Sequence, residues 1–226
     1  MSRLAVNVTA KRFGEHQVLD AVRFEVAAGE RVALLGSSGS GKSTLLSLIA
    51  GIDTGFDGQI SRPQGRIAMV FQTPRLLPWR TLVENIEIVP GASDARALLA
   101  SVGLAEAADQ HPEKVSLGMQ RRAALARAIA VEPGMILMDE PLVSLDPASA
   151  TEMRRLLTET LDRTGAAALI ATHDRREALM LADRVLMLGG TPATIASDRQ
   201  SPLDRMDRLD PGHVSAVHQD WFGVEG

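Results

Sequence analysis

The stretch "GSSGSGKST" at residues 36–44 constrains the chain most, because it fits the pattern G-x-x-x-x-G-K-[ST]. It follows a short apolar run, "RVALLG" (31–36), and leads directly into a helical pattern. Gly36, Gly39 and Gly41 allow the backbone to wrap closely around phosphate groups, with successive N–H groups facing the negative charge. The sequence therefore predicts a phosphate-binding loop, the P-loop, between a buried strand and a helix rather than an ordinary glycine-rich turn.

The side chains of the P-loop have separate expected roles. We expect Lys42 to bridge the outer phosphates of a nucleotide and the Ser43 hydroxyl to bind a magnesium ion. The residues expected to bind phosphate through this loop are Gly36, Ser37, Ser38, Gly39, Ser40, Gly41, Lys42, Ser43 and Thr44.

Apolar periodicity predicts an α/β fold. Short runs rich in Val, Ile, Leu and Met, typical of strands buried on both faces, occupy 31–36, 66–71, 135–140, 167–173 and 184–189. Helical patterns between them occupy 41–52, 118–131, 149–165 and 175–182. Strands that alternate with helices indicate a mainly parallel sheet flanked by helices, with ligands bound at the carboxyl ends of the strands.

Three segments depart from this alternation. Residues 4–13 and 21–30 alternate like half-exposed antiparallel strands, which predicts an N-terminal antiparallel β subdomain. Residues from about 74 to 117 break the strand rhythm, and we expect a small helical subdomain there. The tail from about 191 to 226 gives little signal; we expect it to end in a short helix that Trp221 helps to dock on the core.

Composition limits the remaining choices. A chain of 226 residues with 45% hydrophobic content suits one substantial core, so we expect a single domain over 1–226. A net charge of −4 argues against a surface that coats nucleic acid. The chain has no cysteine, which excludes disulfides and fits a reducing compartment. No stretch approaches about 20 apolar residues, so we expect a soluble, cytoplasmic protein.

Two carboxylates, Asp139 and Glu140, end the apolar run 135–140. A buried strand rarely carries such charges without a reason. We expect Asp139 to hold magnesium through water and Glu140 to orient or deprotonate an attacking water. The alternative is a strand that simply ends in solvated acids, and the P-loop in the same chain argues against it.

Two further polar residues close predicted strands. His173 follows one strand and Gln72 another, and the carboxyl ends of parallel strands meet at one edge of a sheet. We expect His173 to reach the terminal phosphate and Gln72 to sense the metal and the water. Taken alone, each is more typical of a structural residue at a strand end; the shared placement with the P-loop favours the functional interpretation.

In the order of its motifs, the chain resembles the ATP-binding subunits of ABC transporters over about residues 4–190. The motifs are the P-loop at 36–44, "VFQ" at 70–72, "VSLGMQRRAALARA" at 115–128, "MILMDEP" at 135–141, "SLD" at 144–146 and "ATHD" at 171–174. The resemblance implies a P-loop NTPase core that binds ATP and Mg²⁺ and hydrolyses ATP to ADP and phosphate.

The resemblance also implies roles for particular residues. Gln72 belongs to the Q-loop, Asp139 and Glu140 to the Walker B strand, Asp146 to the D-loop, and His173 is the switch histidine. The implied catalytic residues are Lys42, Gln72, Glu140 and His173, and the implied metal ligands are Ser43, Gln72 and Asp139.

Phe13 stands where this family places an aromatic ring that stacks on adenine, a contact that needs a flat π-face. Val18 would pack beside it. The alternative for Phe13 is a half-buried strand residue.

The segment 115–119 corresponds to the family's signature, whose usual form is L-S-G-G-Q. The resemblance implies that Ser116 and Gly118 meet the γ-phosphate of ATP bound to a partner copy, in a dimer with two composite sites. Leu117 stands where the usual pattern has glycine; it would crowd the closed dimer or require a slightly different loop, or else point into the helical subdomain. Val115 and Met119 are milder departures from the pattern.

The implied assembly places this chain on the inner face of the cell membrane. The resemblance implies a second ATPase subunit, integral membrane permease subunits, an external solute-binding protein and no nucleic acid. The stretch "LLPWRTLVENI" (76–86) resembles the corresponding segment of nitrate, sulfonate and taurine importers. Within it Trp79 suits an interface anchor, or alternatively the core of the subdomain. Arg121, Arg122 and Arg127 are interpreted as a solvated, salt-bridged helix face rather than a nucleic-acid patch.

Other functions remain open at this point. An exporter subunit would have much the same ATPase core. A soluble ABC ATPase that acts on DNA or ribosomes would usually show a long coiled-coil insertion or two ATPase cassettes. A P-loop kinase of small metabolites would explain 36–44 and leave the later motifs without a role.

Overall fold

The computed structural model describes residues 3–92 and 94–223. They form two compact units: the P-loop unit, from the described parts of Met1–Gln64 and Ala167–Gly226, and the helical unit, Gly65–Ala166. The chain therefore leaves the first unit, builds the second and returns. The expected single domain over 1–226 stays a prediction.

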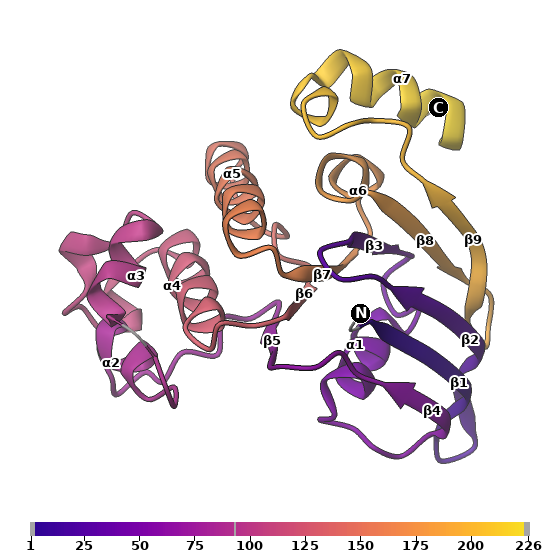
Figure 1. Cartoon of the computed structure of the whole chain (residues 1–226), viewed down its shortest axis with the longest axis horizontal. Coiled ribbons are helices and arrows are strands. Elements are labelled where there is room, and N and C mark those ends of the chain that lie inside the picture. Colours follow the sequence, from indigo (N-terminus) through magenta and orange to yellow (C-terminus); the bar gives the residue numbers. More distant parts are fainter. Residues whose placement is uncertain (1–2, 93, 224–226) are drawn as a thin grey trace. The chain divides into compact units, whose positions relative to one another are not determined.

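An antiparallel sheet in the order β2-β1-β4 lies in the P-loop unit (Figure 1). It consists of β1 (Leu4–Phe13), β2 (His16–Val26) and β4 (Asp57–Ser61). Val6 and Val8 of β1 are buried while Asn7 between them is exposed, which is the alternation of a sheet with one solvated face. This confirms the expected N-terminal antiparallel strands, except that β2 begins at His16; β4 had no clear signal in the sequence.

The second set of strands in the P-loop unit is mostly parallel. β3 (Arg31–Leu35) pairs with β7 (Ala167–Thr172) on one side and with β8 (Arg184–Gly189) on the other, both in parallel. All residues of β3 and β7 are buried, as the continuous apolar runs predict. An unexpected strand in the tail, β9 (Thr194–Gln200), pairs antiparallel with β8.

The helices of the P-loop unit are α1 (Lys42–Ala50), α6 (Arg175–Leu181) and α7 (Pro211–Phe222), with a short 3₁₀ helix, η3 (Asp207–Leu209). α7 packs against α6, and Figure 1 shows the two helices side by side. Trp221 and Phe222 pack on a cluster that contains Ala33, Leu35 and Ala178. The expected docking helix at the end of the tail is therefore confirmed.

The helical unit contains a parallel pair of strands and several helices. β5 (Ile67–Val70) pairs with β6 (Met135–Asp139). The helices are α2 (Leu82–Glu87), α3 (Ala95–Ser101), η1 (Ala105–Ala107), η2 (Pro112–Lys114), α4 (Leu117–Ile129) and α5 (Pro147–Thr164).

Apolar side chains of α2, α3 and α4 form the core of the helical unit. Leu82, Ile86 and Leu99 are fully buried there. Thr81 begins α2 with a capping box: its hydroxyl accepts from the Glu84 N–H, and the Glu84 carboxylate accepts from the Thr81 N–H. The helices expected between 74 and 117 are present.

The α/β fold class is confirmed: each predicted buried strand and each predicted long helix is found within a few residues of its expected bounds. Within the described ranges 3–92 and 94–223, no helix is both long enough and apolar enough to traverse a bilayer.

Candidate nucleotide-binding site

The P-loop follows β3 and favours glycine at two positions. A Cβ on Gly36 would lie 2.6 Å from Ser40 Oγ and 2.8 Å from the Leu188 carbonyl oxygen. At Gly41, φ is +93° and a Cβ would lie 2.8 Å from Leu19 Cδ2. The Leu188 oxygen belongs to the backbone of β8 and cannot move aside as a side chain can, and at Gly41 the positive φ itself favours glycine. The two glycines therefore fix the loop between β8 and β2.

The Lys42 side chain folds back over this loop. Its Nζ donates to the carbonyl oxygens of Gly36 at 2.7 Å and Ser37 at 3.0 Å. Gly41, the N-cap of α1, has no side-chain oxygen to offer the first turn. A helix start without its usual cap, next to a lysine, favours the binding of an anion.

A cavity of about 210 Å³ adjoins the P-loop. Its walls come from the P-loop, from the start of β2 and from the turn after β8. The lining residues are His16, Gln17, Val18, Ser37, Ser38, Gly39, Ser40, Gly189, Gly190, Thr191 and Ala193. The structure thus brings the predicted residue Val18 beside the predicted phosphate-binding residues.

Phe13 ends β1, where it pairs with His16 in the register of the β1–β2 hairpin. The residue is 54% exposed, and the Nζ of Lys11 lies 4.5 Å from the centroid of its ring. A large exposed aromatic ring at the end of a strand is available for stacking.

His173 follows β7 at the end of the sheet where the P-loop begins. Leu35 of β3 is the register partner of Thr172, and the Gly36 N–H donates to the Thr172 carbonyl oxygen at 3.3 Å. The Thr172 hydroxyl donates to Glu177 Oε2 at 2.8 Å and accepts from the Asp174 N–H at 3.0 Å. The backbone on both sides of His173 is therefore held in place.

In the helical unit, Gln72 and the two acids share one edge. Val70 of β5 is the register partner of Met138 of β6, so Gln72 and Glu140 each lie two residues past a paired position. Asp139 and Glu140 are 7% and 9% exposed, although both are acidic. Glu140 has a φ of +49°, a left-handed conformation that is uncommon for residues other than glycine and recurs at functional sites.

Arg121 and Arg127 of α4 do not form the solvated helix face that we expected from the sequence. Arg121 is 5% exposed and donates to the Pro141 carbonyl oxygen at 3.2 Å. Arg127 donates to the carbonyl oxygens of Arg75 at 2.9 Å and Pro74 at 3.0 Å. Burial of Arg127 lowers the pKa of its guanidinium. These side chains tie α4 to the segments after Gln72 and Glu140, a role that the apolar pattern of α4 gave no means to predict.

Arg122 fits the sequence interpretation better. It donates to Glu152 Oε1 at 3.2 Å, and this ion pair joins α4 to α5.

Ser116 is the N-cap of α4, and its hydroxyl accepts a hydrogen bond from the Met119 N–H at 3.2 Å. A Cβ on Gly118 would meet Ser149 Oγ at 3.6 Å and Leu145 Cδ2 at 3.9 Å, which are ordinary contacts. Nothing in the described part of the chain therefore requires glycine at 118.

Leu117 is 41% exposed. Its neighbours Val115 and Met119 pack on the core of the helical unit. This exposure argues against the interpretation that Leu117 points into the helical subdomain, and both interpretations stay predictions.

Asp146 is the N-cap of α5 and accepts from the N–H groups of Ala148 at 3.1 Å and Ser149 at 3.0 Å. Hydrogen bonds from the Ser149 side chain, and then from backbone N–H groups, lower the pKa of the Asp146 carboxyl. This carboxylate is therefore charged at neutral pH while it caps its own helix.

Trp79 precedes α2 and is 70% exposed. Its alternative interpretation as a core residue of the subdomain is therefore wrong. A side chain of this size in solvent is typical of an interaction surface.

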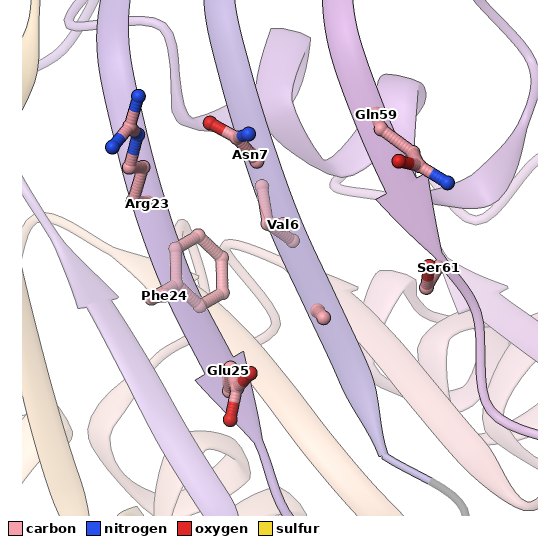
Figure 2. A pocket seen from close by; sticks show the side chains of 8 residues that line it. Val6, Asn7, Arg23, Phe24, Glu25, Gln59 and Ser61 are labelled. Carbon is pink, nitrogen blue, oxygen red and sulfur yellow. The ribbon is translucent and has the colours of Figure 1, made fainter.

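A second hollow, of about 420 Å³, lies on the β2-β1-β4 sheet (Figure 2). Its lining residues are Ala5, Val6, Asn7, Arg23, Phe24, Glu25, Gln59 and Ser61. None of these residues belongs to a motif of the candidate site, so we place that site at the P-loop.

Comparisons with known proteins agree with the geometry. Residues 19–143 match the family model described as ABC transporter. The aliphatic sulfonates import ATP-binding protein SsuB 2 of Burkholderia cenocepacia (strain HI2424) is 39% identical over 92% of this chain and 82% of its own length. The aliphatic sulfonates import ATP-binding protein SsuB of Mycobacterium sp. (strain MCS) is 45% identical over 91% of this chain and 84% of its own length.

A solved structure has the same fold. It is the dimeric structure of a post-hydrolysis state of the ATP-binding cassette MJ0796 bound to ADP and Pi, with a TM-score of 0.74 and 27% identity. The match covers 90% of this chain and 100% of that one. The chain therefore belongs to the ABC transporter family, in which it is an ATP-binding and ATP-hydrolysing subunit.

Proposed function

We propose that this chain powers the import of an aliphatic sulfonate through a separate membrane permease. The observation that carries the proposal is the P-loop, where backbone crowding at Gly36 and a positive φ at Gly41 favour glycine and Lys42 lies over the loop. The sulfonate is supported by the relatives named above, which are import subunits for aliphatic sulfonates, and by the similar segment at 76–86.

ATP binds with its phosphates in the P-loop and its base on Phe13. Lys42 releases the Gly36 and Ser37 carbonyl oxygens and pairs with the outer phosphates, a stronger interaction because both groups are charged. Val18, which lines the cavity beside the loop, packs next to the base.

Magnesium fits the donor set. Ser43, Gln72 and Asp139 would hold it, and their hydroxyl, amide and carboxylate oxygens are ligands that Mg²⁺ prefers. Within residues 3–92 and 94–223, no group of three His, Cys, Asp or Glu residues forms a metal site by itself. A single carboxylate suits an ion that takes its other ligands from phosphate and water. When bound, the ion neutralises charge on the β- and γ-phosphates.

Hydrolysis depends on Glu140. Its carboxylate orients a water and accepts a proton from it as the water oxygen attacks the γ-phosphorus in line with the leaving oxygen. The bond from the γ-phosphorus to the bridging oxygen breaks, and ADP leaves. Burial and the left-handed backbone hold Glu140 in one conformation, which suits a positioned base. His173 and Gln72 orient the phosphate and the water, and Asp146 approaches the same site.

A second copy of the ATPase completes each site. The Ser116 hydroxyl accepts from the Met119 N–H, so its own hydrogen remains able to donate to a γ-phosphate held by the partner. Among the described residues, a Cβ on Gly118 would make only ordinary contacts, so we assign the close approach that favours glycine to the partner's nucleotide. ATP closes the dimer, and hydrolysis opens it again.

The permease docks on the helical unit through Trp79, whose ring is exposed and amphipathic. An external solute-binding protein delivers the sulfonate, and the ATPase works at the inner face of the membrane.

Purification from native membranes tests this function. The tagged chain is solubilised in detergent, its companions are identified, and the complex is reconstituted in liposomes. We expect a polytopic companion and ATP-dependent uptake of radiolabelled methanesulfonate. Trp79→Ala should lose the companion, while the exposed control Ile52→Ala keeps it. Absence of a polytopic companion would favour a soluble ABC ATPase; efflux in place of uptake would identify an exporter, and uptake of nitrate alone would correct the substrate.

A further inference from the structure

Lys11 is a buried cation beneath the ring on which we place the base. Only 4% of the residue is exposed, and its Nζ lies over the Phe13 ring, 4.5 Å from the centroid. More than half of Phe13 is exposed even though the ammonium covers one face of its ring. The opposite face is therefore the one that a ligand can reach.

Two oxygen atoms hold the ammonium at this position. Lys11 Nζ lies 2.6 Å from Asp53 Oδ2 and donates to the Gly55 carbonyl oxygen at 2.8 Å. The other carboxylate oxygen of Asp53 accepts from the Gly55 N–H at 2.9 Å, which fixes the loop after α1. An ammonium has three donors, so the third N–H is left for the ring.

Asp53 is charged at neutral pH. The hydrogen bond from Lys11 is the largest cause that lowers the pKa of this carboxyl, and the Gly55 N–H adds to it. The carboxylate that anchors Lys11 is therefore charged at the pH at which a nucleotide binds. The lysine cannot move away from the ring without breaking its ion pair with Asp53.

The ammonium changes how the ring stacks. Two aromatic faces both carry negative charge in their π-systems, so a face-to-face stack is opposed by electrostatic repulsion. A cation on one face is attracted to the ring and offsets that negative charge. The outer face of Phe13 then repels the π-face of an adenine less than it would without the ammonium on its other face.

We infer that Lys11 is an affinity-determining residue that strengthens the stack between Phe13 and the nucleotide base, acting through the ring rather than touching the nucleotide. The inference rests on the proposed role of Phe13. Lys11 lies in β1, outside every motif. It is inferred to contribute to the binding of the base and not to the binding of the phosphates.

Calorimetric titration of the purified chain with ATP and with inorganic tripolyphosphate tests the inference, since tripolyphosphate has no base. Lys11→Met keeps an unbranched side chain and removes the charge. We expect it to weaken ATP binding about two- to tenfold, because it removes at most the contribution of one aromatic stack, and to leave tripolyphosphate binding unchanged. Arg12→Met is the matched control, because Arg12 is the adjacent cation of β1 and pairs with Asp57 at 3.2 Å.

A second pair of variants covers the outcome that Lys11→Met fails to fold. Lys11→Met combined with Asp53→Asn removes both charges together, so no carboxylate is left unpaired, and the same loss of ATP affinity is expected. Phe13→Ala should weaken ATP binding, and Lys11→Met should add nothing further on that background.

The outcomes separate this inference from the proposed function. If Phe13→Ala weakens ATP binding and Lys11→Met does not, Lys11 has no such role, while the proposed stacking of the base on Phe13 is supported. If Phe13→Ala leaves ATP binding unchanged, the proposed stacking of the base on Phe13 is itself wrong. Equal losses for ATP and tripolyphosphate in Lys11→Met would show that the lysine merely supports the P-loop, which overturns the inference.

Discussion

The Lys42 ammonium lies 2.7 Å from the carbonyl oxygen of Gly36, the residue at which the P-loop leaves β3. The cation of the loop is thus held by the loop's own backbone. A phosphate oxygen carries a full charge and the carbonyl oxygen only a partial one, so ATP displaces an internal hydrogen bond that is weaker than the pair it forms.

This contact leads to a prediction for the replacement of Lys42. We expect Lys42→Ala to weaken ATP binding about ten- to a hundredfold, as loss of a charge-assisted contact of about 1.5–3 kcal/mol predicts. Calorimetric titration gives the dissociation constant. Lys114→Ala, which removes an exposed lysine of η2, is the control. A dissociation constant equal to that of the native chain would contradict the assignment of Lys42.

Replacement of Glu140 separates binding from hydrolysis. Glu140→Gln keeps the shape of the side chain and removes the base, so we expect ATP binding to persist while turnover falls at least about 100-fold. The closed dimer should then accumulate with ATP and Mg²⁺, as measured by size-exclusion chromatography with light scattering. Glu106→Gln, at an exposed position of η1, should hydrolyse ATP normally. Substantial turnover in Glu140→Gln would remove this residue from the role of base.

Gly118 tests whether the signature segment acts outside its own chain. A Cβ at this position makes only ordinary contacts. Alanine also favours a helix over glycine, so Gly118→Ala should leave the free energy of unfolding unchanged or raise it by up to about 1 kcal/mol. Turnover of the assembled complex should fall more than about tenfold, because the added methyl group meets the partner's nucleotide. If thermal denaturation shows a marked loss of stability, the glycine has an internal role instead.

Leu117 tests crowding at the same interface. The residue is 41% exposed. We expect Leu117→Gly to raise the turnover of the assembled complex about two- to tenfold, as relief of about 0.5–1.4 kcal/mol would give. Leu117→Ala, which retains ordinary backbone stiffness, should give much of the same gain. Unchanged or lower turnover in both variants would count against crowding.

Asp183 joins the start of β3 to the C-terminal segment. Its carboxylate accepts from the Arg31 N–H at 3.0 Å and from Arg208 at 2.8 Å. Burial alone would raise the pKa of this carboxyl, but the hydrogen bonds from Arg31 and Arg208 outweigh it, and the pKa lies below its ordinary value of 3.8. The stabilisation is therefore fully present above about pH 4 and is lost as the pH falls through the lowered value.

Replacement of Asp183 should remove that pH dependence. Asp183→Asn is expected to lower the free energy of unfolding at pH 7 by about 1–3 kcal/mol, and its difference from the native chain should shrink below pH 3.8. Denaturant titrations at pH 7 and pH 3 measure both values. Asp57→Asn is the control, because that ion pair is exposed and contributes little. A difference that is the same at both pH values would contradict the role of the charged carboxylate.

Local pattern was enough to predict most of the secondary structure and the P-loop. The apolar runs that became β3 and β7 are buried on both faces, so their composition alone marks them. The glycines at 36 and 41 follow the spacing of a phosphate-binding loop. β4 and β9 were not predicted because they are largely exposed and polar. They are strands because β4 pairs with β1 and β9 pairs with β8.

The sequence by itself determined the chemistry of this protein: which residues carry the P-loop, the acids and the signature segment, and in which order. Only the tertiary structure decided what surrounds them. It buried Arg121 against the Pro141 carbonyl, exposed Leu117 and Trp79, and placed Lys11 beneath Phe13 with Asp53 as its anchor. The physical reason is that the residues of each motif lie close together along the chain, so a local pattern reveals them. Burial and ion pairing depend instead on residues that are distant in sequence and meet only when the chain has folded.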